Sequence, residues 1–546
     1  MSSPPTTCQL TYTSTTKIKM RRLFSSVRGG GGGGAYRLPK IDTPASSNCS
    51  CKSEVNMLDI KTFDECDVTV INEGQLSPPA TPIISSSANF SCGTKTAPAS
   101  AATTAPTAAA AAAAAPATNR PTTRPRAPAP LAIIESIATG APAASRSQSD
   151  VAAQICDLFG PSSPHCARIP RIYANTRIAT RHKAVDPLDP AFDRAMPIRA
   201  RMDLFLTHAA PLAIDVARRA LDAAAVADPA AEIGLLVLVT STGFVAPGVD
   251  VAVTKALGLS PGTKRTIINF MGCAAAMNGL RTAVDYAVAN TADSPSRLGE
   301  TGKKALLVCV ELSSVNGVFK ETLNDVIISS LFGDGCAAVV VGGYAPPPPP
   351  PAPASGLVAE GHDDEEGAEE EEKQDETQQT IEAALRRGDI KPGQIVVRGS
   401  FSHLTDETED GILLGVNGDG ITCDLSAKLP SYIRAGVGPA IGHVLDRHGL
   451  AKADVDLWAI HPGGPKIIDE SIRSLGLPEE AARVSWDVLS RCGNMLSVSL
   501  LFVLQQMVRE VVEGAPGNKA VSSGIAFSFG PGITVEGLVF DVLGRV

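Results

Sequence analysis

The sequence lacks three patterns that would place it in common functional classes. Its 12 cysteines include no pair with CxxC spacing, which argues against a zinc site and fits a reducing intracellular compartment. No apolar run is long enough to cross a membrane. The net charge is −9, and basic residues do not gather into a groove for nucleic acid. We therefore expect no metal, no membrane span and no nucleic acid partner.

Residues 1–128 and 345–391 contain too few large apolar side chains to form a core. The first segment is rich in Ser, Thr, Pro, Ala and Gly, with six consecutive glycines at 29–34 and eight consecutive alanines at 108–115. The second begins with a proline run and continues into the acidic stretch 360–376. Such compositions do not bury enough apolar surface to offset the entropy of ordering the chain. We expect a disordered N-terminal tail and a solvated, Pro-rich acidic insertion.

The N-terminal region also bears on location. The stretch "MRRLFSSVR", which starts at Met20, is basic and contains serines, as organelle transit signals do. We expect the protein in the cytoplasm, with organelle targeting as the alternative.

The remaining parts, 129–344 and 392–546, alternate between strand-like and helical patterns. Runs such as "IGLLVLVTS", "KALLVCVEL" and "VDLWAIHP" are almost continuously apolar, which is typical of strands covered on both faces. Stretches such as "PGVDVAVTKALGL" have helical spacing between them, and helices also fit residues 432–447 and 494–513. This predicts an α/β protein whose strands lie under helices. A glycine and a polar residue precede a small-residue helix in each part, in "MGCAAAMNGL" and "CGNMLSVSLL", which suggests two similar halves.

Cys273 stands where a strand-like run leads into a helical run of small residues. A residue at a helix N-terminus faces unpaired N–H groups and the positive end of the helix dipole. This environment stabilises a thiolate, so we expect a lowered pKa for Cys273. A single cysteine after a strand is more often a plain core residue, and the functional interpretation therefore depends on partners.

Two candidate partners occupy comparable places. Cysteine chemistry needs a base or cation near the sulfur and donors for a developing oxyanion. His461 ends an apolar strand before the glycine-rich turn in "WAIHPGGPKI", and Asn494 stands at a predicted helix start in "SRCGNMLS". Alone, His461 fits a histidine bonded to local backbone and Asn494 fits a helix N-cap. Together with Cys273 they form a candidate Cys-His-Asn active site.

The chain resembles the type III polyketide synthases, the chalcone and stilbene synthase family. The resemblance rests on "MGCAAAMNGLR", "SLFGDGCAAVVVG", "WAIHPGGPKIID", "LSRCGNMLS" and "SFGPGITVEG" in this order, and it runs from Leu131 to Val546 apart from the insertion. It implies a thiolase-like fold with αβαβα layers made of two similar halves, 129–344 and 392–546. The stretch "VELSSVNGVF" is more similar to the bacterial and algal branch than to plant chalcone synthases.

The resemblance also implies the reaction. The enzyme would be a malonyl-CoA-dependent acyltransferase that condenses an acyl-CoA starter with malonyl-CoA units by decarboxylative Claisen condensation. The product would be cyclised to an alkylpyrone, an alkylresorcinol or phloroglucinol. The CoA thioesters are substrates, and no metal or redox cofactor is implied.

Four residues receive specific roles from the resemblance. Cys273 would carry the acyl group as a thioester, and His461 would pair with it as imidazolium and thiolate. His461 and Asn494 would donate hydrogen bonds to the thioester carbonyl and to the enolate formed when malonyl-CoA loses carbon dioxide. Phe332, in "LFGDG", would be the gatekeeper between the CoA tunnel and the cavity; its alternative is a plain core aromatic.

Further positions match the cavity and the CoA entrance of the family. A smaller side chain at Cys423, where plant enzymes carry phenylalanine, would open space for a long acyl chain. Leu496 replaces a small polar residue, which argues against plant-type cyclisation. The candidate cavity residues are Ser241, Thr242, Ser313, Asn316, Cys423 and Leu496. The candidate CoA-binding residues are Arg168, Arg171 and Lys466, because basic side chains suit phosphates and the third basic position of the plant pattern is Asn175 here; their alternative is solvated surface charge.

The resemblance further implies a homodimer. Plant enzymes insert a methionine into the partner's cavity from a position that is Ala246 in this chain, so this crossing would shape the cavity less here.

Three other functions fit some of the same features. A ketoacyl-ACP synthase would use the same residue types but lacks "HPGGP". A cysteine hydrolase would leave "FGPG" without a role, and a catalytically inactive scaffold would not be expected to keep Cys273, His461 and Asn494.

Overall fold

The computed structural model describes residues 129–291, 301–347, 379–514 and 519–545. The predicted tail, 1–128, the candidate transit signal within it, and residues 348–378 of the predicted insertion lie outside these segments.

A mixed sheet of nine strands organises the described part of the chain, in the order β11-β12-β13-β8-β1-β7-β6-β4-β5. Its strands are β1 (Leu131–Gly140), β4 (Ile233–Thr240), β5 (Lys264–Asn269), β6 (Lys304–Leu312), β7 (Asp334–Tyr344), β8 (Ile395–Leu404), β11 (Leu457–Ile460), β12 (Val521–Gly530) and β13 (Thr534–Leu543). Two short ladders lie apart from it, one of β2 (Ser145–Ser147) with β3 (Thr180–His182) and one of β9 (Ile412–Asn417) with β10 (Gly420–Leu425).

The two ends of the sheet repeat one pairing pattern. Strand β1 pairs antiparallel with β7, β7 antiparallel with β6, and β6 parallel with β4. Strand β8 pairs antiparallel with β13, β13 antiparallel with β12, and β12 parallel with β11. The two series meet where Ala132–Ile134 of β1 pair with Ile395–Val397 of β8. The prediction of two similar halves is therefore confirmed.

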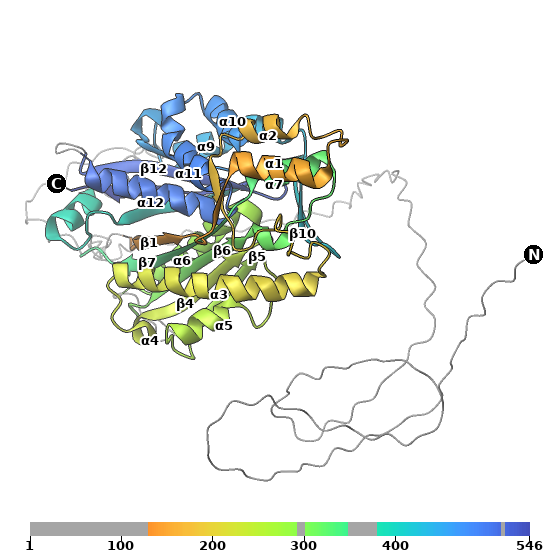
Figure 1. Cartoon of the computed structure of the whole chain (residues 1–546). Coiled ribbons are helices and arrows are strands. Elements are labelled where there is room, and N and C mark those ends of the chain that lie inside the picture. Colours follow the sequence, from red (N-terminus) through yellow and green to blue (C-terminus); the bar gives the residue numbers. More distant parts are fainter. Residues whose placement is uncertain (1–128, 292–300, 348–378, 515–518, 546) are drawn as a thin grey trace, which may run out of the picture. The chain divides into compact units, whose positions relative to one another are not determined.

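The main helices lie in three layers that separate and cover the two halves (Figure 1). Besides a helix at residues 379–387, the described α-helices are α1 (Gln148–Phe159), α2 (Ile169–Asn175), α3 (Ile198–Ala223), α4 (Pro229–Glu232), α5 (Val249–Ala256), α6 (Ala275–Ala289), α7 (Leu323–Leu331), α9 (Leu429–Arg447), α10 (Pro465–Leu475), α11 (Arg483–Cys492) and α12 (Val498–Glu513). Helices α3 and α5 cover the first half, α9 and α10 cover the second, and α6 and α12 pack between them.

Burial explains why the strands have continuous apolar runs. In β4, Leu236 and Leu238 face the cluster under α3 and α5, whereas Leu235 and Val237 face the cluster around α6 and α12. Alternate side chains of one strand thus enter two different cores, and both faces must be apolar. The predicted αβαβα layering is confirmed.

The described end of the predicted insertion differs from the expectation. Residues 379–387 form a helix, and Ile381, Ala384 and Ile390 are buried in one cluster with Val396 of β8 and Leu543 of β13. Apolar residues at positions 381, 384 and 385 recur with helical spacing and give this segment one apolar face. The part of 345–391 that follows residue 378 therefore packs on the sheet instead of forming a solvated loop.

None of the helices in the described segments is long and apolar enough to cross a membrane.

Candidate active site

Cys273 lies in a short 3-10 turn, Gly272–Ala274, between β5 and α6. Gly272 has φ +56°, a conformation that glycine adopts without steric cost. Its N–H donates to the Oγ of Ser241 over 3.1 Å, and the Oγ of Ser528 donates to the carbonyl of Cys273 over 2.8 Å. Hydroxyl groups on both sides thus hold the backbone that presents the thiol.

Asn494 lies between α11 and α12 and is joined to the segment of Phe332. Its N–H donates to the carbonyl of Leu331, and its own carbonyl accepts from the N–H of Gly333, both over 2.9 Å. Helix α12 begins only at Val498, so the prediction of a helix from residue 494 is wrong at this end. The bridge to Phe332 and the left-handed φ of +50° at Leu496 are incompatible with a helical start here.

The side chain of Asn494 meets Cys273. Its Nδ2 lies 3.8 Å from the Sγ of Cys273 and donates to the carbonyl of Gly463 over 3.2 Å. The Oδ1 of Asn494 accepts from the N–H of Leu496 over 2.8 Å, which orients the amide. The structure therefore brings these two residues together across 221 positions of sequence.

His461 follows β11 and packs against the same turn. Its backbone N–H donates to the carbonyl of Phe527, and its carbonyl accepts from the N–H of Gly463. A Cβ atom at Gly463 would stand 2.9 Å from Cδ2 and 3.0 Å from Nε2 of His461. The imidazole therefore lies against the residue whose carbonyl accepts from Asn494. His461 is 2% exposed, and neither ring nitrogen has a hydrogen-bond partner among the described residues, which leaves both for a substrate.

Burial dominates the protonation of this site. It raises the pKa of the Cys273 thiol, with smaller contributions from Cys423 and Glu311, and the hydrogen bond from Asn494 only partly opposes it. Burial also lowers the pKa of His461 to about 3. Burial therefore favours the neutral thiol and the neutral imidazole in the substrate-free protein. The prediction of a lowered pKa for Cys273 is wrong in this state, because it considered the helix terminus and not the loss of solvent.

Glu311, a residue that the sequence reasoning did not single out, lies behind the site. This carboxyl group of β6 is fully buried and accepts from the N–H of Ser241 at 2.9 Å, from the Oγ1 of Thr242 at 2.8 Å and from the Oγ of Ser497 at 2.6 Å. Burial raises its pKa to about 7 against these hydrogen bonds. Its signal in the sequence is an acidic residue inside the apolar run "KALLVCVEL", since acidic residues are rarely buried unless paired.

Two candidate cavity residues have hydroxyl groups that already serve the protein. The Oγ of Ser241 accepts from Gly272, and the Oγ1 of Thr242 bonds to Glu311 and to the N–H of Leu312. The hydroxyl group of Ser241 thus supports the residue before Cys273, and that of Thr242 joins Glu311 to the backbone of Leu312.

The other candidate cavity residues lie on neighbouring elements. Asn316 ends a 3-10 turn that starts at Ser313, and it bonds to the carbonyl of Thr242 and the N–H of Ile421. The Oγ of Ser313 is buried without a partner in the described segments. Cys423 of β10 lies close enough to raise the pKa of the Cys273 thiol. Leu496 is buried, two residues after Asn494.

The candidate CoA-binding cations stand on the surface. Arg168 and Arg171 are exposed at the start of α2, and Lys466 is exposed at the start of α10, five residues after His461. Their side chains are accessible to an anionic ligand.

Comparison with known protein families identifies the chain. The family model for the N-terminal domain of chalcone and stilbene synthases matches residues 129–346, and that for the C-terminal domain matches residues 397–543. The chain belongs to the chalcone and stilbene synthase family of type III polyketide synthases. It is an acyltransferase of polyketide biosynthesis, and this family uses acyl-CoA and malonyl-CoA. The resemblance inferred from the motifs is confirmed, and the two matched ranges leave out residues 347–396.

Individual relatives agree with this assignment. The alpha-pyrone synthesis polyketide synthase-like Pks18 of Mycobacterium tuberculosis is 51% identical over 425 residues, which cover 77% of this chain and 94% of that protein. The crystal structure of PKS-I from the brown alga Ectocarpus siliculosus is 35% identical with a TM-score of 0.62, over 76% of this chain and 99% of that one. The 1,3,6,8-tetrahydroxynaphthalene synthase of Streptomyces coelicolor A3(2), 22% identical with a TM-score of 0.58 over 76% and 99% of the two chains, shares the fold.

Proposed function

We propose that this type III polyketide synthase loads an acyl-CoA starter on Cys273, extends it with malonyl-CoA and releases an alkyl-α-pyrone. The observation that carries the proposal is the amide of Asn494. It lies 3.8 Å from the sulfur of Cys273 and donates to Gly463, the residue against which His461 packs. This arrangement supports a proposed nucleophile, general base and hydrogen-bond donor within one buried region.

Loading begins with transfer of the thiol proton of Cys273 to a ring nitrogen of His461. The thiolate then attacks the starter thioester, while the amide of Asn494 and the imidazolium donate to the carbonyl oxygen as it becomes negative. The bond to CoA breaks, and the CoA sulfur takes the proton from His461. A thiolate and imidazolium pair has no net charge, so it forms at lower cost than either ion alone in this dry site.

Extension uses the same two donors on a different carbonyl. Malonyl-CoA loses carbon dioxide, and the electron pair of the broken bond moves to the thioester carbonyl as an enolate held by His461 and Asn494. The enolate carbon attacks the acyl carbonyl on Cys273 and expels the cysteine thiolate. Decarboxylation itself generates the carbanion, so no carboxylate base is needed, and the extended chain returns to Cys273 for the next cycle.

Ring closure to an α-pyrone requires attack by an enol oxygen of the extended chain on its own thioester, which expels the thiol. Leu496 gives the surroundings of Asn494 an apolar side chain, and Cys423 leaves room for a long alkyl group. The name of the relative that is 51% identical supports an α-pyrone product. Phe332 is the proposed gatekeeper, and Arg168, Arg171 and Lys466 are the proposed contacts of the CoA phosphates.

Product analysis tests this proposal directly. Purified protein receives malonyl-CoA alone, then malonyl-CoA with short, medium and long acyl-CoA starters, with Cys273→Ala as the control, and products are identified by mass spectrometry. Alkylpyrones from the wild type and none from the control are expected. Alkylresorcinols, or phloroglucinol from malonyl-CoA alone, would reassign the cyclisation. Dependence on malonyl-acyl carrier protein would favour a ketoacyl-ACP synthase, and equal product from the control would exclude the mechanism.

We also propose a homodimer that uses the edge of strand β5. This strand ends the sheet order and exposes Ile267 at 49%, while the nearby Phe244 is 66% exposed and packs edge-on against Phe270. An uncovered edge with apolar side chains favours pairing with another strand, and a second copy of this chain would supply one. Light scattering after size exclusion should give twice the chain mass for the wild type and a monomer for Ile267→Lys; a monomeric wild type would contradict the proposal.

Residues 1–128 and 348–378 are proposed to be dispensable for catalysis, because the family matches begin at residue 129 and omit residues 347–396. A protein starting at residue 129 should keep its turnover. Loss of turnover in a folded truncated protein would show that the tail contributes.

The seven described cysteines are all free thiols, which fits the proposed cytoplasmic location; cell fractionation would test it.

A further inference from the structure

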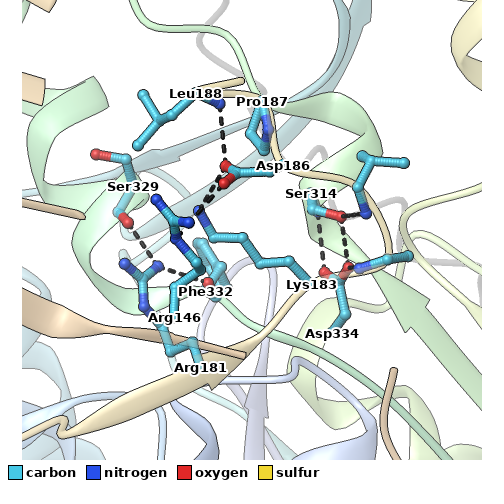
Figure 2. Close-up of polar contacts among 12 residues, drawn as sticks. Arg146, Arg181, Lys183, Asp186, Pro187, Leu188, Ser314, Ser329, Phe332 and Asp334 are labelled. Atoms are coloured by element: carbon cyan, nitrogen blue, oxygen red, sulfur yellow. Dashed lines mark hydrogen bonds and ion pairs between the residues drawn. The ribbon is translucent and has the colours of Figure 1, made fainter. Parts of the chain in front are cut away.

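Arg181 of β3 is a buried arginine that reaches the proposed gatekeeper. It is 2% exposed, and its Nη1 donates to the carbonyls of Ser329, over 2.6 Å, and Phe332, over 2.8 Å. Its Nε donates to the Oε1 of Gln148 over 3.0 Å. Figure 2 shows the guanidinium directed at the Ser329 and Phe332 carbonyls. Both carbonyls lie at the C-terminal end of α7, where a helix leaves carbonyl groups unpaired.

The stem of Arg181 also contacts the segment of Asn494. Gly493 has φ +69°, and a Cβ atom there would stand 2.8 Å from both Cγ and Cδ of Arg181. Asn494 follows directly and is bridged to Phe332 through the backbone. One side chain therefore touches the two adjoining segments that carry the proposed gatekeeper and the proposed donor.

Neighbouring contacts limit how the segment of Phe332 can move. Gln148, which accepts from Arg181, donates to the carbonyl of Ser330 over 2.7 Å. Asp334 accepts from the N–H of Ala184 over 2.7 Å. It also accepts from the N–H of Ser314 over 2.9 Å (Figure 2). The short stretch 181–184 thus forms hydrogen bonds with both Phe332 and Asp334.

Burying a charged side chain costs free energy, because the charge loses its contact with water. Burial lowers the pKa of Arg181, and Tyr173 and Asp334 only partly oppose this. Apolar side chains of similar volume are often as stable as a buried ionic group, or more so. What arginine adds is a planar fork that donates in several fixed directions at once, which lysine cannot reproduce.

We infer that Arg181 is a positioning residue that fixes Phe332 and Asn494 relative to each other and thereby sets the rate of condensation and the preferred starter length. This inference rests on the proposed roles of Phe332 and Asn494. Displacements of about 1 Å at a reacting centre can cost about 100-fold in rate, so a loosened segment should act on kcat and on selectivity. Arg181 itself contacts neither Cys273 nor His461 in the described hydrogen bonds.

The test compares Arg181→Lys with Arg398→Lys. Arg398 is also largely buried, with its side chain 11% exposed, and it pairs with Asp541 between β8 and β13. Each variant receives malonyl-CoA and acyl-CoA starters of graded length, and kcat, KM, product ratios and melting temperature are measured. We expect Arg181→Lys to lower kcat about 10- to 100-fold and to change the product ratio between starters. Arg398→Lys should lower the melting temperature and leave that ratio unchanged.

A milder variant keeps the test decisive if Arg181→Lys does not fold. Gln148→Ala retains the arginine and removes the acceptor of its Nε, so it should change the starter preference relative to the wild type, with a smaller loss of kcat than the loss expected for Arg181→Lys. A folded Arg181→Lys with wild-type kcat and product ratio, or a folded Gln148→Ala with an unchanged ratio where the lysine variant fails, would overturn the inference. Absence of product from the wild type would instead refute the proposed function, and this inference with it.

Discussion

The chain enters the two central helices in similar ways but with different supports. Before α6, the left-handed Gly272 precedes Cys273; before α12, the left-handed Gly493 precedes Asn494. We call the turn at Gly272–Cys273 the first helix entrance and the turn at Gly493–Asn494 the second. The neutral hydroxyl groups of Ser241 and Ser528 support the first entrance. The cationic Arg181 and a backbone bridge hold the second. No cation thus supports the backbone at Cys273, the proposed nucleophile, in these contacts. The proposed amide donor, Asn494, does not titrate, and its backbone segment is supported by a cationic side chain.

Glu311 joins the two entrances. Its carboxylate accepts from the N–H of Ser241, whose Oγ supports Gly272, and from the Oγ of Ser497 just before α12. One buried carboxyl group, whose pKa burial raises to about 7, therefore contributes to the placement of both the sulfur and the amide. Substitutions at either entrance, or at Glu311 between them, therefore test how the two entrances differ.

The largest effect is expected from removing the nucleophile at the first entrance. Cys273→Ala should abolish acylation, because it removes the thiol that lies beside the amide of Asn494. Intact-protein mass spectrometry after incubation with acyl-CoA should show an adduct on the wild type and none on the variant. Cys309→Ala removes another buried thiol, in β6, and should keep the adduct; an adduct on Cys273→Ala would identify a different nucleophile.

Removing the donor at the second entrance should cost less. Asn494→Ala deletes the Nδ2 group that lies 3.8 Å from Sγ, and loss of one oxyanion donor lowers kcat by about 10²- to 10³-fold. Steady-state kinetics with one starter would measure it, and the acyl adduct on Cys273 should still form slowly. Asn290→Ala, at the C-terminal end of α6, is the matched amide control, and a wild-type kcat in Asn494→Ala would remove Asn494 from the mechanism.

Moving the imidazole of His461 through a substitution at Gly463 should have an intermediate effect. A methyl group at Gly463 would stand 2.9 Å from Cδ2 of His461, closer than carbon atoms approach, so Gly463→Ala must tilt the ring. We expect kcat to fall about 10- to 100-fold. Gly442→Ala in α9 has open space around its Cβ and should leave kcat unchanged while raising stability by up to about 1 kcal/mol. Equal kcat values in the two variants would show that the ring position is not critical.

The sequence predicted the fold well where burial has a local signature. Strands β4, β6 and β7 are buried on both faces, and their continuous apolar runs were recognisable. The helix at 379–387 was not predicted, because the acidic run before it dominated the composition of the whole interval. Its burial depends on contacts with β8 and β13, which no local pattern reveals.

The site was predictable only as far as its motifs reached. Cys273, His461 and Asn494 stand in short motifs at element ends. Arg181 and Glu311 act over 151 and 186 positions of sequence, on Phe332 and Ser497, so their partners appear only in the folded chain. The direction of the Cys273 pKa was wrong for the same reason, since desolvation comes from distant elements packing over the thiol.

The smallest and most specific effect is expected at Glu311, which links the two entrances. The folded-state pKa of Glu311, about 7, lies above its ordinary value of 4.5, so the folded state binds this proton more tightly. The stabilisation is complete below pH 4.5 and is lost as pH rises to about 7, with a slope of at most about 1.4 kcal/mol per pH unit. Glu311→Gln cannot titrate and should lack this component. Urea unfolding at several pH values would compare the slopes, since the variant also changes the hydrogen bonds from Ser241 and Ser497 and absolute stabilities therefore differ. Parallel pH profiles for the two proteins would mean that Glu311 keeps its ordinary pKa in the folded protein, and that a charged carboxylate joins the two entrances at neutral pH.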